Sequence, residues 1–283
     1  MAGRAVVKVA RERDGTGLGR SLRLLRLFRS EQGDPDLFYG VLAEDTVRQV
    51  AGYCEIPGAT VVDVGGGSGW FTAAFRARGA RCCLIEPDRA ELFSRPGRQP
   101  SPGGTTPRTP RGLPDGTATA SGRQALTGAA QGNGLQLPLR DGAADITFSS
   151  NVLEHVPDPE RMIAEMIRVT RKDGLIYLAF TNWYSPWGGH EMSPWHYLGA
   201  GLAERRYARR YGREPKHKVG ASLFRVHIGS VLRTLRVLRA RGDIEIIDAR
   251  PRYYPPWCRP LVRVPGLREV VTWNLMLVMR RTG

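Results

Sequence analysis

The residues whose types and spacing most clearly permit chemistry form a glycine-rich turn after a short apolar run. Val61–Val64 contains Asp63 and is followed by Gly65, Gly67 and Gly69 in a D-x-G-x-G-x-G pattern. The apolar run predicts a buried strand, and the glycines predict a tight turn into a helix. Glycine has no side chain, so such a turn lets a ligand approach the backbone closely. We therefore expect a ligand site where this strand ends.

The acid beside the turn separates two classes of ligand. The dinucleotide fingerprint has the spacing G-x-G-x-x-G and holds a pyrophosphate at the start of its helix. Here the spacing differs, and Asp63 places a negative charge where a pyrophosphate would lie. A ligand with a positive charge or hydroxyl donors fits better. S-adenosylmethionine offers an ammonium, a sulfonium and a ribose, whereas NAD is the alternative.

A second acid follows at the spacing of one β-α-β unit. Residues 81–85 form another short apolar run, and Glu86 follows it, 21 residues after Gly65. A carboxylate at the tip of a second strand accepts hydrogen bonds from ribose hydroxyls. This holds for NAD and for S-adenosylmethionine, so Glu86 supports nucleoside binding without choosing between them.

The most specific block lies further along the chain. Residues 132–139 read GNGLQLPL, and residues 145–156 read DITFSSNVLEHV. With the glycine turn, they resemble the class I S-adenosylmethionine-dependent methyltransferases, in particular the group with an L-P-F…F-D…L-E-H-V signature. The resemblance covers residues 59–181, and the whole chain also resembles an actinobacterial branch of that family. It implies methyl transfer, with S-adenosylmethionine as the cofactor.

The resemblance also implies a fold. We expect a Rossmann-like, doubly wound α/β sheet of seven strands in the order 3-2-1-4-5-7-6, with the last strand antiparallel. Residues 1–16 are predicted to be a mobile tail, 17–58 a helical cover, and 59–283 the methyltransferase domain. Within that domain, residues 94–131 are poor in large apolar side chains and are predicted to be disordered. Residues 182–224 are rich in aromatics and are predicted to form a lid.

The resemblance assigns ten positions to the cofactor. Asp63 is expected near the methionine ammonium and Glu86 at the ribose hydroxyls. Asn133 stands where the family usually has Asp beside the adenine, and its carbonyl can still accept a hydrogen bond. The full set is Asp63, Gly65, Gly67, Gly69, Glu86, Asn133, Gly134, Leu135, Ser150 and Asn151.

Methyl transfer depends mainly on alignment and exclusion of water, so no nucleophilic triad is expected. His155 is a candidate base for an acceptor hydroxyl, and the alternative is a purely structural role at a helix start. His190 and Glu191 in the lid are the other catalytic candidates. Similar ubiquinone-biosynthesis methyltransferases bind a metal through an acid-x-x-Glu-His cluster. Here Asn151 replaces the first acid, so no metal is expected.

Composition bears on partners and location. The net charge is +15, but the positive residues are scattered and only four of the 42 are lysines. We therefore expect a small-molecule substrate and no nucleic acid. Leu18, Leu22, Leu25 and Phe28 predict an amphipathic helix that packs on the core, with peripheral membrane contact as the alternative. There is no apolar run of transmembrane length and no cysteine pattern, so a cytoplasmic protein is expected. The acceptor and the oligomeric state stay open.

Three functional interpretations thus remain. The first is a small-molecule methyltransferase acting on an O, N or C nucleophile, with a lipid-like or quinone-like acceptor. The second is an NAD-binding oxidoreductase. The third is a methyltransferase-fold module with weak activity, because residues 94–131 fall where the third strand is expected.

Overall fold

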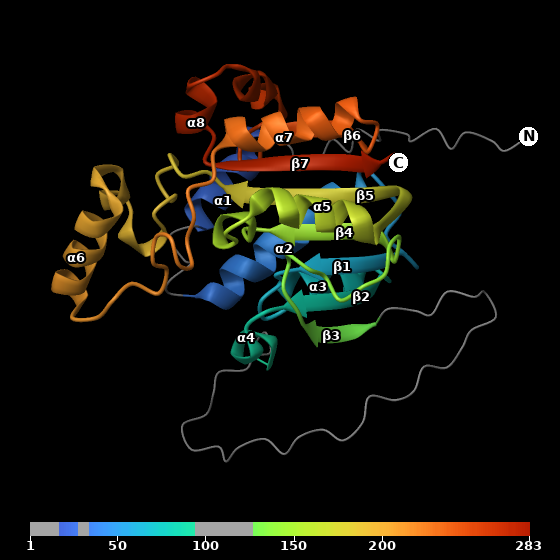
Figure 1. Ribbon diagram of the computed structural model, residues 1–283, viewed down its shortest axis with the longest axis horizontal. Helices are drawn as coiled ribbons and strands as arrows, with labels where there is room; N and C mark the ends of the chain where they lie inside the picture. The colour runs from blue at the N-terminus through green and yellow to red at the C-terminus, as the bar shows by residue number, and fades with distance from the viewer. Residues whose placement is uncertain (1–16, 28–33, 94–126) are drawn as a thin grey trace, which may run out of the picture.

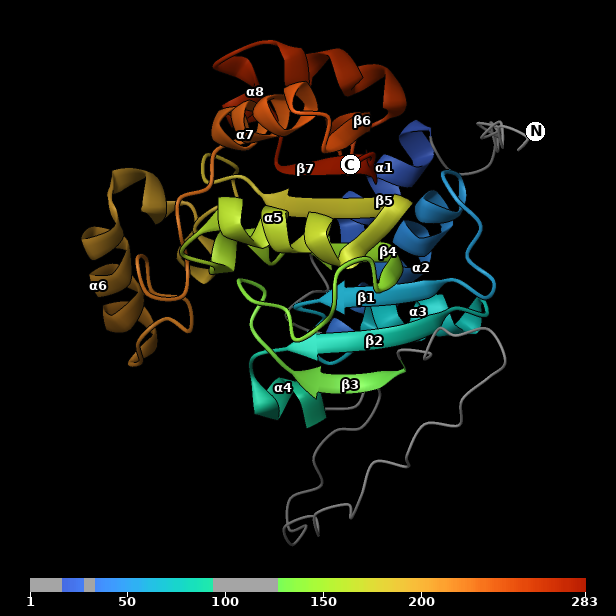
Figure 2. The same ribbon diagram turned by 45° about the vertical axis from the view of Figure 1, so that its right-hand side comes forward.

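The computed structural model of the protein describes residues 17–27, 34–93 and 127–283. Seven strands form one sheet in the order β3-β2-β1-β4-β5-β7-β6 (Figures 1 and 2). The strands are β1 Thr60–Val64, β2 Arg81–Glu86, β3 Gly128–Gln131, β4 Ala144–Ser150, β5 Thr170–Thr181, β6 Ile244–Pro251 and β7 Asn274–Arg281. β7 runs antiparallel to both β5 and β6. The predicted strand order and the predicted antiparallel last strand are confirmed.

Helices cover both faces of the sheet (Figure 1). The helices are α1 Leu18–Leu27, α2 Pro35–Ala51, α3 Trp70–Ala77, α4 Arg89–Phe93, α5 Pro159–Val169, α6 Ala200–Tyr211, α7 Ile228–Ala240 and α8 Leu267–Val271. Short 3-10 helices are η2 Leu153–His155, η3 His190–Met192, η4 Trp195–Leu198 and η5 Pro256–Arg263. α1 to α3 lie against one face, and α5 and α7 lie against the other.

The two faces have separate hydrophobic cores because the central strands are buried on both sides. On the face of α2 and α3, the Phe148 and Tyr177 rings stack with centroids 4.9 Å apart. On the face of α5 and α7, Met162 and Leu178 are fully buried. Parallel strands covered on both faces read as nearly continuous apolar runs, which is why β1 and β2 could be predicted.

Two helices begin with the same local chemistry. Asp34 Oδ1 accepts from the Leu37 N–H at 3.0 Å before α2, and Asp158 Oδ1 accepts from the Arg161 N–H at 2.9 Å before α5. A proline follows each aspartate, at a position where no N–H donor is needed. These caps fix where both helices start relative to the sheet.

The N-terminal helix α1 packs in an orientation that differs from the predicted one. Ser21 and Leu24 are buried, whereas Leu18 and Leu22 are 60% and 44% exposed. The reason is a buried ion pair: Arg20 Nη2 lies 2.6 Å from Asp45 Oδ2 of α2. This pairing turns the Arg20 side of the helix inward. The helix packs on the core through Leu24, with Leu27 against it, but the prediction that Leu18 and Leu22 face the core is wrong. Phe28 lies outside the described residues.

The edge strand β3 corrects the predicted extent of the disordered insert. Residues 128–131 pair in parallel with Cys83–Glu86 of β2, so the prediction over residues 94–131 is wrong at its carboxyl end. An edge strand needs only backbone pairing and one covered face, and this short strand has almost no large apolar side chain to signal it. Residues 1–16 and 94–126 lie outside the described part of the chain.

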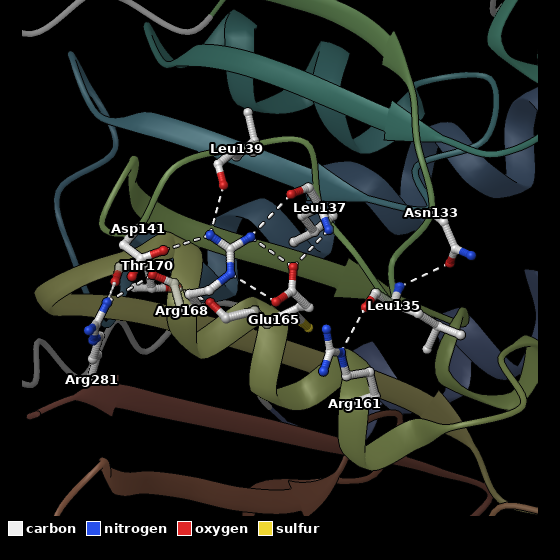
Figure 3. A network of polar contacts seen from close by, with 11 residues as sticks. Asn133, Leu135, Leu137, Leu139, Asp141, Arg161, Glu165, Arg168, Thr170 and Arg281 are labelled. Carbon is white, nitrogen blue, oxygen red and sulfur yellow. Dashed lines mark hydrogen bonds and ion pairs between the residues drawn. The ribbon is translucent and has the colours of Figure 1, made fainter.

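The segment after β3 is fastened to α5 by a polar network (Figure 3). Glu165 Oε2 accepts from the Leu137 N–H at 2.8 Å and pairs with Arg168. Arg168 also donates to the Leu139 carbonyl at 2.8 Å and pairs with Asp141. The hydrogen bond from Arg168 lowers the pKa of Glu165 despite its burial, so this carboxylate stays charged. The network fixes residues 135–141 on α5.

The lid segment, residues 182–224, extends beyond the carboxyl ends of the parallel strands, and α6 is its largest element (Figures 1 and 2). It has a small core of its own, made by Trp183, Met192, Ala203 and Leu223. In the described part of the chain, no helix combines the length and apolar character needed to cross a membrane.

Candidate active site

The glycine turn and the second acid meet at the tips of β1 and β2. Gly65 N–H donates to the Ile85 carbonyl at 2.7 Å, and Gly67 N–H donates to Glu86 Oε2 at 2.9 Å. Glu86 Oε1 accepts from the Asp88 N–H at 3.0 Å, and the side chain is almost fully buried. Two backbone donors thus orient the carboxylate that was predicted to bind ribose.

The glycines of the turn are needed for different structural reasons. Gly65, Gly67 and Gly69 have φ values of +70°, +54° and +90°, a region that favours glycine. A Cβ on Gly65 would lie 2.5 Å from the Val152 side chain, whereas a Cβ on Gly67 would meet nothing within 4 Å. One side of Gly67 is therefore open, as a turn that a ligand approaches requires.

Asp63 lies beneath this turn and is almost completely buried. Its Oδ2 accepts from the Thr72 hydroxyl at 2.7 Å. Burial raises the pKa of Asp63 to about 6, against the opposing hydrogen bonds from Thr72, and the nearby Glu86 adds to the rise. A cationic ligand group beside this carboxyl would favour its charged form.

The residues assigned to the adenine form a turn that is held by an internal hydrogen bond. Asn133 Oδ1 accepts from the Leu135 N–H at 2.9 Å, so this oxygen already has a partner within the chain. A Cβ on Gly134 would lie 3.4 Å from Val64, which places the turn beside the end of β1. The three residues are thus close to the glycine turn, and Arg161 Nε donates to the Leu135 carbonyl at 3.1 Å.

Ser150 and Asn151, assigned to the methionyl end, lie at the tip of β4. Asn151 has a positive φ of 58°, and its Oδ1 accepts from Asn274 Nδ2 at 2.8 Å. Ser150 Oγ accepts from Arg252 Nη1 at 2.8 Å. This contact adds Arg252 to the site, a residue that was not predicted from the sequence.

Arg252 is a buried cation without a direct ion-pair partner in the described residues, although the Asp45 and Glu154 carboxylates act on it electrostatically. It is 1% exposed, and its Nη2 donates to Thr46 Oγ1 at 2.9 Å. Among the described residues it forms no ion pair, and its Nε has no hydrogen-bond partner. A buried charge without a direct ion-pair partner is costly. An anionic group on a ligand would offset that cost. Nothing in the sequence distinguishes Arg252 from the many scattered arginines.

The catalytic candidates come together in a cluster that also includes His217. The ring centroid of His155 lies 4.8 Å from that of His190 and 4.9 Å from that of His217, and the His190 and His217 centroids are 4.7 Å apart. Glu191 Oε2 accepts from His217 Nδ1 at 2.8 Å. His217, in a basic loop after α6, carries no local signal that sequence reasoning would detect.

The electrostatics of the cluster distinguish the three predicted candidates. Burial, reinforced by the neighbouring His155 and His217, lowers the pKa of His190 to about 3. Burial would raise the pKa of Glu191, but the hydrogen bonds from His217 outweigh it and lower this pKa to about 2. His190 and Glu191 are therefore weak bases at neutral pH, which leaves His155 as the base candidate.

The fold and the site together define a class of protein. The sheet has this strand order, and a glycine turn and an acid lie at the tips of adjacent strands, as in nucleoside-binding α/β domains. The antiparallel last strand distinguishes the sheet from that of the dinucleotide-binding fold.

Comparison with known proteins identifies the family. The chain matches the methyltransferase domain family over residues 37–220. It is 42% identical over 269 residues to an uncharacterized methyltransferase of Mycobacteroides abscessus, covering 93% of this chain and 94% of that protein. It is 43% identical over 271 residues to another from Mycolicibacterium gilvum, covering 94% and 95%. The chain therefore belongs to the methyltransferase domain family, as the sequence motifs predicted.

A solved structure shares the fold. The S-adenosylmethionine-dependent methyltransferase of Mesorhizobium loti superposes with a TM-score of 0.51 at 18% identity, covering 84% of this chain and 98% of that one.

Proposed function

We propose that this methyltransferase moves a methyl group from S-adenosylmethionine to a small-molecule acceptor with an O, N or C nucleophile. The observation that carries the proposal is the hydrogen bond from Gly67 N–H to Glu86, because it brings the open turn and the ribose-binding acid to one place. S-adenosylmethionine supplies a methyl group that its sulfonium already activates. The protein has only to bind, orient and exclude water.

The described residues match the parts of this cofactor. Glu86 is oriented to accept the ribose hydroxyls, and the open side of Gly67 admits the ligand. Asp63 offers a carboxylate to the methionine ammonium. Arg252, a buried guanidinium whose Nε has no hydrogen-bond partner among the described residues, offers a partner to the methionine carboxylate beside Ser150. A pyrophosphate at the glycine turn would instead lie beside the Asp63 carboxylate, which argues against NAD.

The acceptor that we propose has an apolar body, lipid-like or quinone-like. The lid segment presents half-exposed aromatic side chains, among them Tyr184, Trp187 and Tyr197. Aromatics with polar tips suit a ligand that combines an apolar body with a polar reacting group. Where the acceptor is a hydroxyl, His155 would take its proton through Nε2, provided that this nitrogen binds no other ligand, because Nδ1 is held by the Ser222 carbonyl.

Calorimetric titration with S-adenosylhomocysteine and with NADH tests the methyl donor. We expect saturable binding of S-adenosylhomocysteine and none of NADH. Tight binding of NADH alone would favour the oxidoreductase interpretation. A dissociation constant for S-adenosylhomocysteine above about 1 mM would favour the weak module instead, because it corresponds to only about 4 kcal/mol of affinity.

A further inference from the structure

The three histidines at the junction of the lid and the sheet are arranged as a ligand set. His155 follows β4, His190 lies in η3 and His217 lies in the loop after α6. One ring nitrogen from each lies within 4.8 Å of the others. Three imidazoles at about 2.05 Å from a tetrahedral ion have nitrogens about 3.3 Å apart, so the nitrogens have to approach one another by up to about 1.5 Å when an ion binds.

Hydrogen bonds to neighbouring oxygen atoms already orient two of the three imidazole rings. His155 Nδ1 lies 2.7 Å from the Ser222 carbonyl, so this nitrogen carries the hydrogen. His217 Nδ1 donates to the Glu191 carboxylate at 2.8 Å. Metal-binding histidines typically donate one ring N–H to a carbonyl or carboxylate, which leaves the other nitrogen for the ion. Both contacts therefore assign the free coordinating atom to Nε2.

The third ring has an unsatisfied atom. His190 Nε2 is buried and has no hydrogen-bond partner among the described residues. An unpaired polar atom at this depth costs free energy unless a ligand or ion satisfies it.

We propose that His155, His190 and His217 bind one divalent transition metal ion of the zinc class, with at least one coordination position left for water or an acceptor oxygen. Imidazole suits such ions, and three protein ligands with an open position are typical of catalytic zinc sites. The three ligands come from separate segments, so the ion also joins the lid segment to the tip of β4. No metal was expected from the sequence, because Asn151 replaces the first acid of the known cluster and the cysteines have no metal-binding spacing, whereas these three histidines lie far apart in the chain.

Metal binding is independent of the proposed methyl donor and is measured without turnover. Protein freed of metal with a chelator is titrated with Zn²⁺, and the matched variants are His217→Ala, Glu191→Gln and His227→Asn. His227 is a partly buried histidine outside the cluster, stacked near Tyr184. We expect one equivalent of Zn²⁺ in the wild type and in His227→Asn. The other two variants should bind at least about tenfold more weakly.

Co²⁺ substitution of the wild type identifies the ligands even if a variant fails to fold. Visible bands of a nitrogen- and oxygen-ligated ion support the triad, whereas a thiolate charge-transfer band would place the ion at cysteines and overturn it. Absence of stoichiometric Zn²⁺ binding, or equal affinity in His217→Ala, would also overturn it. Zn²⁺ binding without S-adenosylhomocysteine binding would remove only the proposed function, and the converse would remove only the metal site.

Discussion

Asp63 is the residue whose ionisation should control cofactor affinity. Its pKa is raised to about 6 in the free protein by burial, so the carboxyl becomes protonated as the pH falls below that value. The ammonium of the ligand interacts favourably only with the charged form. We expect the dissociation constant for S-adenosylhomocysteine to rise as pH falls below 6, by up to about tenfold per unit. Isothermal titration between pH 5 and 7.5 measures it.

The control for this dependence is Asp63→Asn, which has a similar shape and no titration. It should bind more weakly at neutral pH and show a flat profile over the same range. A wild-type profile that is equally flat would remove Asp63 from the ammonium site.

Substitution of Arg252 should change the affinities of two related ligands to different extents. Arg252→Met should weaken S-adenosylhomocysteine binding about tenfold or more, because a charge-assisted hydrogen bond to the carboxylate is lost. Methylthioadenosine has the same nucleoside and no amino acid, so its affinity should be unchanged. Titration of both ligands measures the difference. Equal losses for both would mean that Arg252 acts only through its contacts to Thr46 and Ser150.

At the scale of elements, the glycine turn offers two adjacent substitutions that should lower stability for different reasons. A Cβ on Gly66 would collide with Leu84 and lie 2.5 Å from Asp63 Oδ2, so Gly66→Ala should lower the free energy of unfolding by about 1–3 kcal/mol. A Cβ on Gly67 would meet no atom, so Gly67→Ala should lower the free energy of unfolding by only about 1–2 kcal/mol, because of the positive φ at this position.

The affinities should follow a different pattern from the stabilities. A methyl group on Gly67 would occupy the open side of the turn. Gly67→Ala should therefore weaken S-adenosylhomocysteine binding strongly, although its effect on folding is small. Urea unfolding and ligand titration on the same samples provide both numbers. Unchanged affinity in Gly67→Ala would show that no ligand approaches this turn.

The features predicted from sequence are those that a local pattern determines. The apolar runs of β1 and β2, the turn glycines and the acid at Glu86 each depend on neighbouring residues, and their spacing places them on adjacent strands. The strand order came from the family resemblance. The cap at Asp158 was likewise readable from its following proline.

Other features depend on contacts between distant segments and left no local signal. β3 is held by backbone pairing with β2, and its residues Gly128–Gln131 have little apolar surface. Arg252 and His217 gain their importance only from what the fold places around them. The orientation of α1 follows from the Arg20–Asp45 ion pair, which outweighs the exposure of Leu18 and Leu22.

At the scale of the whole molecule, the ion pair joins the two helices of the N-terminal cover, and the same arginine connects them to the sheet. Arg20 also donates to the Arg252 carbonyl at 3.2 Å, so it connects α1, α2 and the end of β6. Arg20→Ala removes the close ion-pair partner of the buried Asp45 and leaves it the Gln49 amide and the more distant Arg23, which should lower the free energy of unfolding by about 3 kcal/mol. Urea denaturation measures the change.

Arg23 provides the matched control on the same helix. Its side chain is 55% exposed and lies 3.9 Å from the same Asp45 carboxylate. Exposed pairs contribute little, so Arg23→Ala should cost less than about 1 kcal/mol. Similar losses in both variants would mean that the cover is held by its apolar contacts.

The central claim is that the tips of β1, β2 and β4 bind a sulfonium nucleoside, and a crystal structure with S-adenosylhomocysteine tests it most directly. We predict density for the ribose hydroxyls at Glu86, with the amino acid end toward Ser150 and Arg252. Density for the ligand elsewhere, or protein side chains filling the space beside Gly67, would contradict the account.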